Sequence, residues 1–304
     1  MSVSAKPILV LGATGRHGGT GATVARLLRE RGLRVRALTR TIDARVAPLE
    51  AIGAEVVTGD LHDRRSLKGA LEGVDVAYFM YPVAAGIVDA AANFASAGRA
   101  AGLKRVVVMS MAISHPESMS HLGRAQWVAE EVLEWAGFSC LQLRIAALFF
   151  ENLELLHRDD ILGDGVIRNS FPDIPLNWIA GEDAGKLAVA ALLYPERFEG
   201  KTAAYPTGHE QYSHSDIAGL LARHLGRTLR HERISPEAWC ERLIARGSRD
   251  NRISTDLARH ISAMGAGIGP IPLNDLFERV TQEKQLSLQE ALESGRISFE
   301  SGRA

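Results

Sequence analysis

The chain has 304 residues, of which 46% are hydrophobic and 23% charged, and its 35 basic residues nearly balance its 36 acidic ones to give a formal net charge of −1. These values are ordinary for a globular protein, so they exclude the disordered, fibrous and coiled-coil classes. They also argue against direct nucleic-acid binding, because a protein that coats nucleic acid carries a clear basic excess.

The sequence carries no pattern for membrane insertion or export. Residues 76–88, the most apolar stretch without a charge, are too short to span a bilayer. The N-terminus lacks the hydrophobic region and cleavage site of a signal peptide. Cys140 and Cys240 lack CxxC spacing and the histidines lack ligand spacing, so we expect no disulfide and no metal site. A cytoplasmic protein that does not bind membranes fits these patterns best.

The first half of the chain alternates short apolar runs with longer helical patterns. Strands are predicted at residues 8–11, 33–39, 55–58, 74–81, 105–111 and 140–146, and helices at 23–31, 63–71, 84–101 and 125–135. This alternation is typical of βαβ units, and right-handed crossovers place their strands in one doubly wound parallel sheet. We therefore predict an α/β fold of the Rossmann type.

The second half is less regular and more helical. We expect strand character at residues 176–179 and 201–205, and helices at 182–193, 215–225 and 237–246, with further helical segments near 255, 273 and 288. The predicted organisation is a first domain over 1–150, with additions to its sheet from about 176–208. A smaller, mostly helical lobe over 209–304 follows it.

A glycine-rich turn lies directly between the first strand and the first helix. Glycines there let the backbone N–H groups and the helix N-terminus approach a pyrophosphate, so the first domain is predicted to bind NAD(P). A nucleoside-triphosphate loop is excluded, because no lysine occurs between Lys6 and Lys68. The predicted cofactor contacts in this turn are Gly12, Thr14, Gly15, Arg16, His17, Gly18 and Gly21.

The ends of the next two strands bear on which dinucleotide binds. Arg40 follows the second strand and, with Arg16, could clamp a 2′-phosphate, which favours NADP(H) over NAD(H). Asp43 lies close by and weakens that preference. Asp60 and Leu61 follow the third strand, where a carboxylate and an apolar side chain suit the edge and face of adenine.

Ligands of doubly wound sheets bind beyond the carboxyl ends of the strands. This rule selects Met80, Tyr81 and Pro82 after the fourth strand and Ser110 at the end of the fifth as contacts near the nicotinamide. Tyr81, Ser110 and His115 are the candidate catalytic residues. Each also has a purely structural interpretation: a packed aromatic ring, a hydroxyl that satisfies the backbone, and an ordinary loop residue.

These residues resemble the NmrA-like group of atypical short-chain dehydrogenases/reductases. The resemblance covers at least residues 7–195, and the SPEAW segment in the helical tail also fits. The motifs that carry it are GATGxxG at 12–18, VRALTR at 35–40, GDLxDxxSLxxAL at 59–71, VVVMS at 106–110 and an LRxAxFFEN-like segment at 143–152. It implies a Rossmann-type fold that binds NAD(P).

The chain departs from that group in two places. Gly18 lies six residues before Val24 where the family has about three, so either Gly18 or Gly21 could pack the helix on the strand. No tyrosine is followed four residues later by lysine, although typical short-chain dehydrogenases use that pair to protonate a carbonyl. Gln126 stands where many relatives carry the lysine.

Three functions remain open from the sequence. The first is an NAD(P)H-dependent reductase of a quinone-like or other conjugated small molecule, which needs little help from an acid. The second is a non-catalytic redox sensor that binds NADP(H) and acts through a protein partner. The third is a carbonyl or imine reductase with an improvised acid such as Tyr81, His115 or His121. A homodimer is also left open.

Overall fold

The central feature of the computed structural model is a seven-stranded, fully parallel sheet in the order β10-β6-β5-β4-β1-β2-β3. The structure describes residues 6–15, 19–265 and 267–299. The strands are β1 (Ile8–Leu11), β2 (Val35–Thr39), β3 (Glu55–Thr58), β4 (Val76–Phe79), β5 (Arg105–Met111), β6 (Ser139–Ile145) and β10 (Ala203–Ala204). The order changes direction between β1 and β4, where doubly wound sheets bind their ligands. The predicted α/β fold of the Rossmann type is confirmed.

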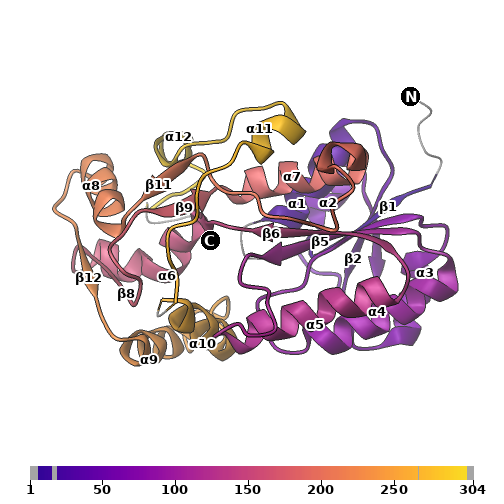
Figure 1. The fold of residues 1–304 in the computed structure, drawn as a ribbon, viewed down its shortest axis with the longest axis horizontal. Helices are drawn as coiled ribbons and strands as arrows, with labels where there is room; N and C mark the ends of the chain where they lie inside the picture. The colour runs from indigo at the N-terminus through magenta and orange to yellow at the C-terminus, as the bar shows by residue number, and fades with distance from the viewer. Residues whose placement is uncertain (1–5, 16–18, 266, 300–304) are drawn as a thin grey trace.

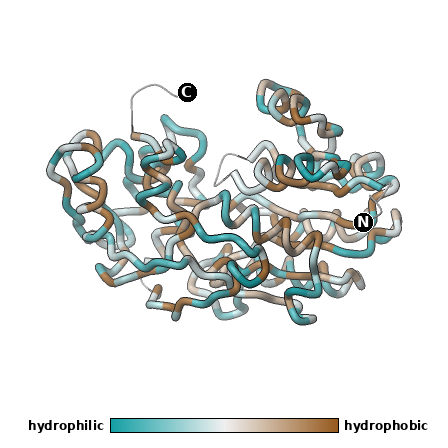
Figure 2. Tube along the Cα trace, turned by 90° about the horizontal axis from the view of Figure 1, so that it is seen from above, coloured by the Kyte–Doolittle hydropathy of each residue, from teal (hydrophilic) through white to brown (hydrophobic). Residues whose placement is uncertain are grey.

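Helices cover both faces of this sheet (Figure 1). One face packs against α1 (Thr20–Glu30), α2 (Ala47–Ala51), α7 (Gly181–Leu193), η2 (Pro195–Phe198) and α11 (Leu276–Thr281). The other packs against η1 (Arg64–Leu67), α3 (Lys68–Leu71), α4 (Ile87–Ala101) and α5 (His121–Trp135). Hydrophobic and hydrophilic segments alternate along the helices in Figure 2, which is the pattern of helices that bury one face.

The second lobe has its own apolar core and two small sheets. One sheet has the order β11-β9-β7 and the other pairs β12 with β8. The strands are β7 (Leu148–Phe149), β8 (Val166–Asn169), β9 (Leu176–Ile179), β11 (Glu210–Tyr212) and β12 (Arg230–Arg233). The helices are α6 (Glu151–Leu162), α8 (His214–Leu225), α9 (Pro236–Gly247), α10 (Thr255–Met264) and α12 (Leu288–Glu293). The strand at 176–179 therefore belongs to the three-stranded sheet, while β10 joins the main one.

A cluster of buried histidines lies in the core of this lobe. The His214 ring stacks on Phe171 and on His231, with centroid distances of 5.3 and 5.0 Å, and His157 stacks on Trp239 at 5.9 Å. Burial lowers the pKa of His214 to about 3 and lowers the pKa values of His157 and His231 as well. All three rings are therefore neutral near pH 7.

Within the described part of the chain, no helix is long and apolar enough to cross a membrane.

Candidate dinucleotide and acceptor site

The glycine turn brings backbone close to backbone where α1 leaves β1. A Cβ on Gly21 would lie 2.5 Å from the Gly12 carbonyl oxygen, and one on Gly15 would lie 2.9 Å from the same oxygen. Gly12 has a φ of 73°, which favours glycine. Gly21 therefore packs α1 closely against the end of β1. Arg16, His17 and Gly18 lie outside the described residues, and Thr14, partly buried, does not line the cavity described below.

The N-terminus of α1 presents backbone N–H groups beside this turn, and no side chain of the described residues caps them. Gly19 precedes the helix with a φ of 61°, no side chain caps the first turn, and the turn holds no acidic residue. Free N–H groups and the positive end of the helix dipole suit a pyrophosphate. Together with the close approach at Gly21, they fit a dinucleotide better than a turn that only reverses the chain.

The end of β2 is followed by an exposed arginine, Arg40, and by an aspartate, Asp43, that is paired with another arginine. Arg40 is exposed and makes no side-chain hydrogen bond or ion pair with the described residues. Asp43 instead accepts hydrogen bonds from the Arg45 guanidinium at 2.9 and 2.5 Å. These bonds lower the pKa of the Asp43 carboxyl to about 2. Arg40 is therefore available to an anion, whereas Asp43 already has a partner.

The end of β3 forms a short, hydrogen-bonded turn. Ser66 Oγ accepts a hydrogen bond from the Asp60 N–H at 2.8 Å, and Asp60 Oδ1 accepts one from His62 N at 2.9 Å. Leu61 is partly buried, and its carbonyl accepts a bond from Asn93 Nδ2 at 2.9 Å. Asp60 and Leu61 thus stand at the expected edge of the sheet.

A cavity of about 240 Å³ opens from the glycine turn across the carboxyl ends of β4, β5 and β6. Gly12, Gly15 and Thr20 border one end, and side chains of α10 and of the following loop border the other. Met80, Tyr81, Pro82 and Ser110 all line it. The cavity therefore adjoins the proposed pyrophosphate cradle and extends into the second lobe.

The lining of this cavity is mostly apolar and rich in methionine. Every methionine among the described residues borders it or a second cavity of about 180 Å³ beside it. Met264 and Ile268 line both. Four methionines line the first cavity (Met80, Met109, Met111 and Met264), and Met119 lines the second. Thioether side chains are polarizable and adaptable, and they make favourable contacts with aromatic rings.

Of the three candidate catalytic residues, two have hydroxyl groups that already donate a hydrogen bond within the protein, and the third lies outside the first cavity. The Tyr81 hydroxyl donates to the Ala85 carbonyl at 3.0 Å and lies 2.8 Å from His62 Nε2, and burial raises the pKa of this tyrosine. Ser110 Oγ donates to Glu130 Oε1. His115 is exposed and lines only the second cavity. None of the three points an uncommitted proton into the first cavity.

Glu130 anchors a buried polar network behind Ser110. Its side chain is 2% exposed, and its Oε2 accepts two bonds from Arg144, at 3.0 Å from Nε and 2.5 Å from Nη2. The Arg144 guanidinium also lies 4.7 Å from the centre of the Trp127 ring. Both Arg144 bonds converge on Oε2 and leave Oε1 to accept the Ser110 hydroxyl, so Glu130 holds that hydroxyl as a hydrogen-bond donor.

Gln126 lines the first cavity, and its amide nitrogen has no hydrogen-bond partner among the described residues. The residue is 4% exposed, and its Nε2 makes no hydrogen bond to any described residue. A buried amide without a partner is costly, so the geometry calls for an acceptor from a bound ligand. Gln126 thus offers a neutral N–H donor to the cavity.

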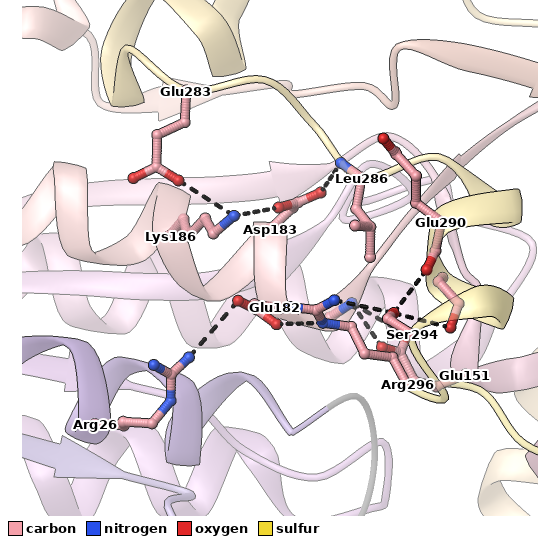
Figure 3. A network of polar contacts seen from close by, with 12 residues as sticks. Arg26, Glu151, Glu182, Asp183, Lys186, Glu283, Leu286, Glu290, Ser294 and Arg296 are labelled. Carbon is pink, nitrogen blue, oxygen red and sulfur yellow. Dashed lines mark hydrogen bonds and ion pairs between the residues drawn. The ribbon is translucent and has the colours of Figure 1, made fainter.

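Charged side chains tie the C-terminal segment to α7 and α1 (Figure 3). Glu182 lies between Arg296 at 2.7 Å and Arg26 at 3.7 Å. One turn further along α7, Lys186 contacts Asp183 at 3.1 Å and Glu283 at 3.2 Å. Asp183 Oδ2 also accepts the backbone N–H of Leu286 at 2.7 Å. These contacts fix the C-terminal segment against the helix that packs on α1.

Comparison with known proteins identifies the family. The model of the NmrA-like family matches residues 4–266. The chain belongs to the NmrA-like family. A curated relative, the NAD(P)H azoreductase of Xenophilus azovorans, is 31% identical over 76% of this chain and 78% of its own length. The resemblance drawn from the sequence motifs is therefore confirmed.

Two solved structures share the whole NmrA-like fold. An NADPH-dependent quinone oxidoreductase from Escherichia coli, complexed with NADPH, has a TM-score of 0.77 at 19% identity and covers 95% of this chain and 100% of its own. The negative transcriptional regulator NmrA, in complex with NAD, has a TM-score of 0.72 at 17% identity, covering 97% and 99%. At these identities the likeness extends to the fold alone.

The sequence motifs did not point to the part of this NmrA-like site that comes from the second lobe. His260, Ile261 and Met264 on α10 line the first cavity, and Ile268 and Ile271 follow in the next loop. Asn177 on β9 holds this loop through a bond from its Nδ2 to the Ile271 carbonyl at 3.1 Å. No motif in the sequence connects these residues with the glycine turn. Only the helical periodicity of residues 255–264 indicates that some of them lie on a buried face.

Proposed function

We propose that this protein reduces a flat, apolar, electron-poor acceptor, of the quinone or azo class, with NADPH. The broader class, an NAD(P)H-dependent oxidoreductase of the NmrA-like family, follows from its membership and its azoreductase relative. The carrying observation is the methionine-lined cavity next to the glycine turn. A bound nicotinamide supplies hydride there, and the chain's own side chains orient the acceptor and exclude water.

The hydrogen bonds around the cavity favour an acceptor that needs little acid. The sequence contains no Tyr-x-x-x-Lys pair, and the protons of Tyr81 and Ser110 are committed to Ala85 and Glu130. A carbonyl or imine needs a strong proton donor as it is reduced, whereas a quinone or azo compound delocalises the incoming electrons. This difference argues against a carbonyl reductase with Tyr81 as its acid.

An acceptor panel tests this function. Purified protein is mixed with NADPH and, in turn, a naphthoquinone, a neutral azo dye, an aldehyde and a cyclic imine, and NADPH absorbance is followed. We expect turnover with the quinone or the azo dye and at least about 10-fold lower kcat/KM with the aldehyde and the imine. Turnover confined to the aldehyde or the imine would contradict the proposal.

A preference for NADPH over NADH is part of this proposal, and it rests on Arg40. Replacing Arg40 with Ala removes a cation that can pair with the 2′-phosphate, so the Kd for NADPH should rise by about 10- to 100-fold. The Kd for NADH should change by less than about 2-fold, since NADH lacks that phosphate.

Titration of both cofactors by fluorescence measures these affinities. Arg223→Ala, which removes an exposed arginine on α8, is the matched control and should leave both affinities unchanged. Equal weakening of NADPH and NADH by Arg40→Ala would show that Arg40 does not read the phosphate.

The second candidate is a redox sensor that binds NADP(H) and acts through a protein partner. The neutral Gln126 in the place of a catalytic lysine favours it, because an amide cannot transfer a proton at neutral pH. Tight NADP(H) binding with no turnover on any acceptor of the panel would support this alternative.

A further inference from the structure

One of the polar side chains that line the first cavity differs from the others in its hydrogen bonding. Six polar side chains border this cavity, and five of them hydrogen bond within the described part of the chain. These five are Thr20 with Tyr78, Tyr81 with Ala85, Ser110 with Glu130, Asn177 with Ile271 and His260 with Ser120. The sixth is Gln126, whose Nε2 has no partner among the described residues. Its two N–H groups are therefore open to a ligand.

Gln126 is also unusual for the face of the helix on which it lies. Leu122, Ala129 and Leu133 on this face of α5 are apolar and buried. Glu130 is polar, but it has an arginine partner. Gln126 is 4% exposed, and a buried amide costs free energy unless its N–H groups find an acceptor. Because the residue lines the cavity, a molecule bound there can supply that acceptor.

The bond between Ser110 and Glu130 indicates where this amide lies. Glu130 follows Gln126 by four residues, so the two side chains are neighbours on one face of α5. Ser110, in the last turn of the chain along β5 before Met111, donates its hydroxyl to Glu130 Oε1. Gln126 is thus held beside the carboxyl end of β5, where the cavity opens.

An amide in this place suits the negative charge that develops during a reduction. A carbonyl oxygen or an azo nitrogen gains negative charge as hydride arrives, and a fixed N–H donor stabilises the charged form more than the neutral one. An amide does not titrate near neutral pH, so it remains a donor throughout. Removal of one such donor from an active site lowers kcat by about 100- to 1,000-fold in a well-studied case.

We propose that Gln126 donates a hydrogen bond from Nε2 to the carbonyl oxygen or azo nitrogen of the acceptor on which negative charge develops. This assignment rests on the proposed reductase function. In the step, the acceptor gains two electrons and one hydrogen as hydride from the bound nicotinamide, which is oxidised. An electron pair of the acceptor's C=O or N=N π system moves onto the heteroatom beside Gln126. Water then supplies the proton that completes the reduced product, and the amide keeps both of its N–H bonds.

Variants of Gln126 test the donor. Gln126→Met keeps an unbranched side chain of similar length without an N–H, and Gln126→Asn keeps the amide on a shorter chain. At saturating NADPH, Gln126→Met should lower kcat for the naphthoquinone at least about 10-fold with an unchanged Kd for NADPH. Gln126→Asn should retain more of kcat than Gln126→Met. Gln289→Met, which changes an exposed glutamine on α12, is the matched control and should leave kcat unchanged.

Thermal unfolding separates a donor for the acceptor from an amide that holds the fold. Because Gln126 Nε2 has no partner among the described residues, Gln126→Met should unfold at the same temperature as the wild type or at a higher one. A glutamine that stabilises the protein through its amide would lower the unfolding temperature when replaced.

A spectroscopic readout tests the contact without turnover. Naphthoquinone is added to the protein saturated with NADP⁺, which cannot deliver hydride, and the side-chain amide resonances are followed in a ¹H–¹⁵N spectrum. The pair of resonances lost in Gln126→Met identifies Gln126. One of its two protons should move downfield when the quinone binds.

The outcomes separate this proposal from the proposed function. Absence of turnover in the wild-type protein with every acceptor would refute the reductase function and with it the donor role. Normal wild-type turnover with full activity in Gln126→Met, or Gln126 resonances that do not move with bound quinone, would overturn the donor assignment alone. A weaker Kd for NADPH with unchanged kcat in Gln126→Met would place the amide on the cofactor and would also overturn it.

Discussion

Gly21→Ala should weaken NADPH binding by at least about 100-fold, because displacement of a binding group by about an ångström has effects of that size. The new Cβ would lie 2.5 Å from the Gly12 oxygen, 2.6 Å from the Gly12 carbonyl carbon and 2.8 Å from Ala13 N. All three are backbone atoms, so no side chain can rotate to relieve the contact. Either α1 or the glycine turn must shift, and the turn is the proposed pyrophosphate cradle.

Calorimetric titration with NADPH measures this effect. Gly69→Ala, with open space around its Cβ, is the matched control and should bind NADPH like the wild type. Gly15→Ala, whose Cβ would lie 2.9 Å from the Gly12 oxygen and 3.2 Å from the Met80 Cε, gives a graded case if Gly21→Ala does not fold. Wild-type affinity in both loop variants would contradict the placement of the pyrophosphate in this turn.

The second lobe should lose stability as the pH falls below about 6.5. His157, His214 and His231 have lowered pKa values in the folded protein, whereas an unfolded histidine titrates near 6.5. Below that pH the unfolded chain binds more protons than the folded one, so protonation favours unfolding. The contribution of His214 is complete above about pH 6.5 and is lost as the pH falls toward about 3, with a limiting slope of about 1.4 kcal/mol per pH unit. His157 and His231 act in the same direction.

Charged groups around the cluster modify the pKa values of its rings, but less than burial does. Asp173 lies 3.4 Å from His231 Nδ1 and raises the pKa of that histidine, though less than burial lowers it. Arg233 lowers the pKa of His231, and Arg246 lowers that of His157. Burial dominates in each case, so the direction of the pH dependence follows from the apolar packing of the rings.

Urea unfolding from pH 7.5 to 5 measures this dependence. His214→Phe places another ring on Phe171 without a titrating group and should flatten the slope by about 1.4 kcal/mol per pH unit. His224→Gln, which changes an exposed histidine on α8, should leave the slope unchanged. A wild-type free energy of unfolding that is constant over this range would contradict the neutral buried cluster.

The main sheet could be predicted from the sequence because its strands are short apolar runs bounded by glycine, proline or charge. Residues 8–11, 55–58 and 105–111 match β1, β3 and β5 at both ends. The first helix begins at Thr20 and not at Thr23, because Gly19 in the left-handed conformation starts it without a capping side chain. Glycines have low helix propensity, so the sequence pattern places the start of a helix that follows a glycine-rich turn too late.

The small strands of the second lobe could not be predicted in this way. β12 reads Arg-His-Glu-Arg and pairs with β8, whose segment ends in Arg168 and Asn169. Neither segment has an apolar alternation, since their pairing depends on partners 64 residues apart in the sequence (Arg230 with Val166). Tertiary contacts, more than local pattern, form this sheet.

The candidate site also has a part that the local sequence predicts and a part that depends on tertiary contacts. The glycine turn and the strand ends follow from local sequence, so Gly12, Gly21 and Arg40 could be proposed in advance. His260 and Ser120 are 140 residues apart, and only the packing of α10 on α5 brings them together. The methionines are one sequence feature that could have indicated the cavity, because Met80, Met109 and Met111 all lie at or near the carboxyl ends of strands.

The central claim is hydride transfer from NADPH to an apolar aromatic acceptor in the methionine-lined cavity. Single-turnover oxidation of NADPH by a naphthoquinone, followed anaerobically with the transferable hydrogen at C4 as protium or deuterium, tests it most directly. We expect stoichiometric oxidation that is slower with deuterium than with protium. Stable NADPH absorbance in the presence of bound quinone would contradict the account.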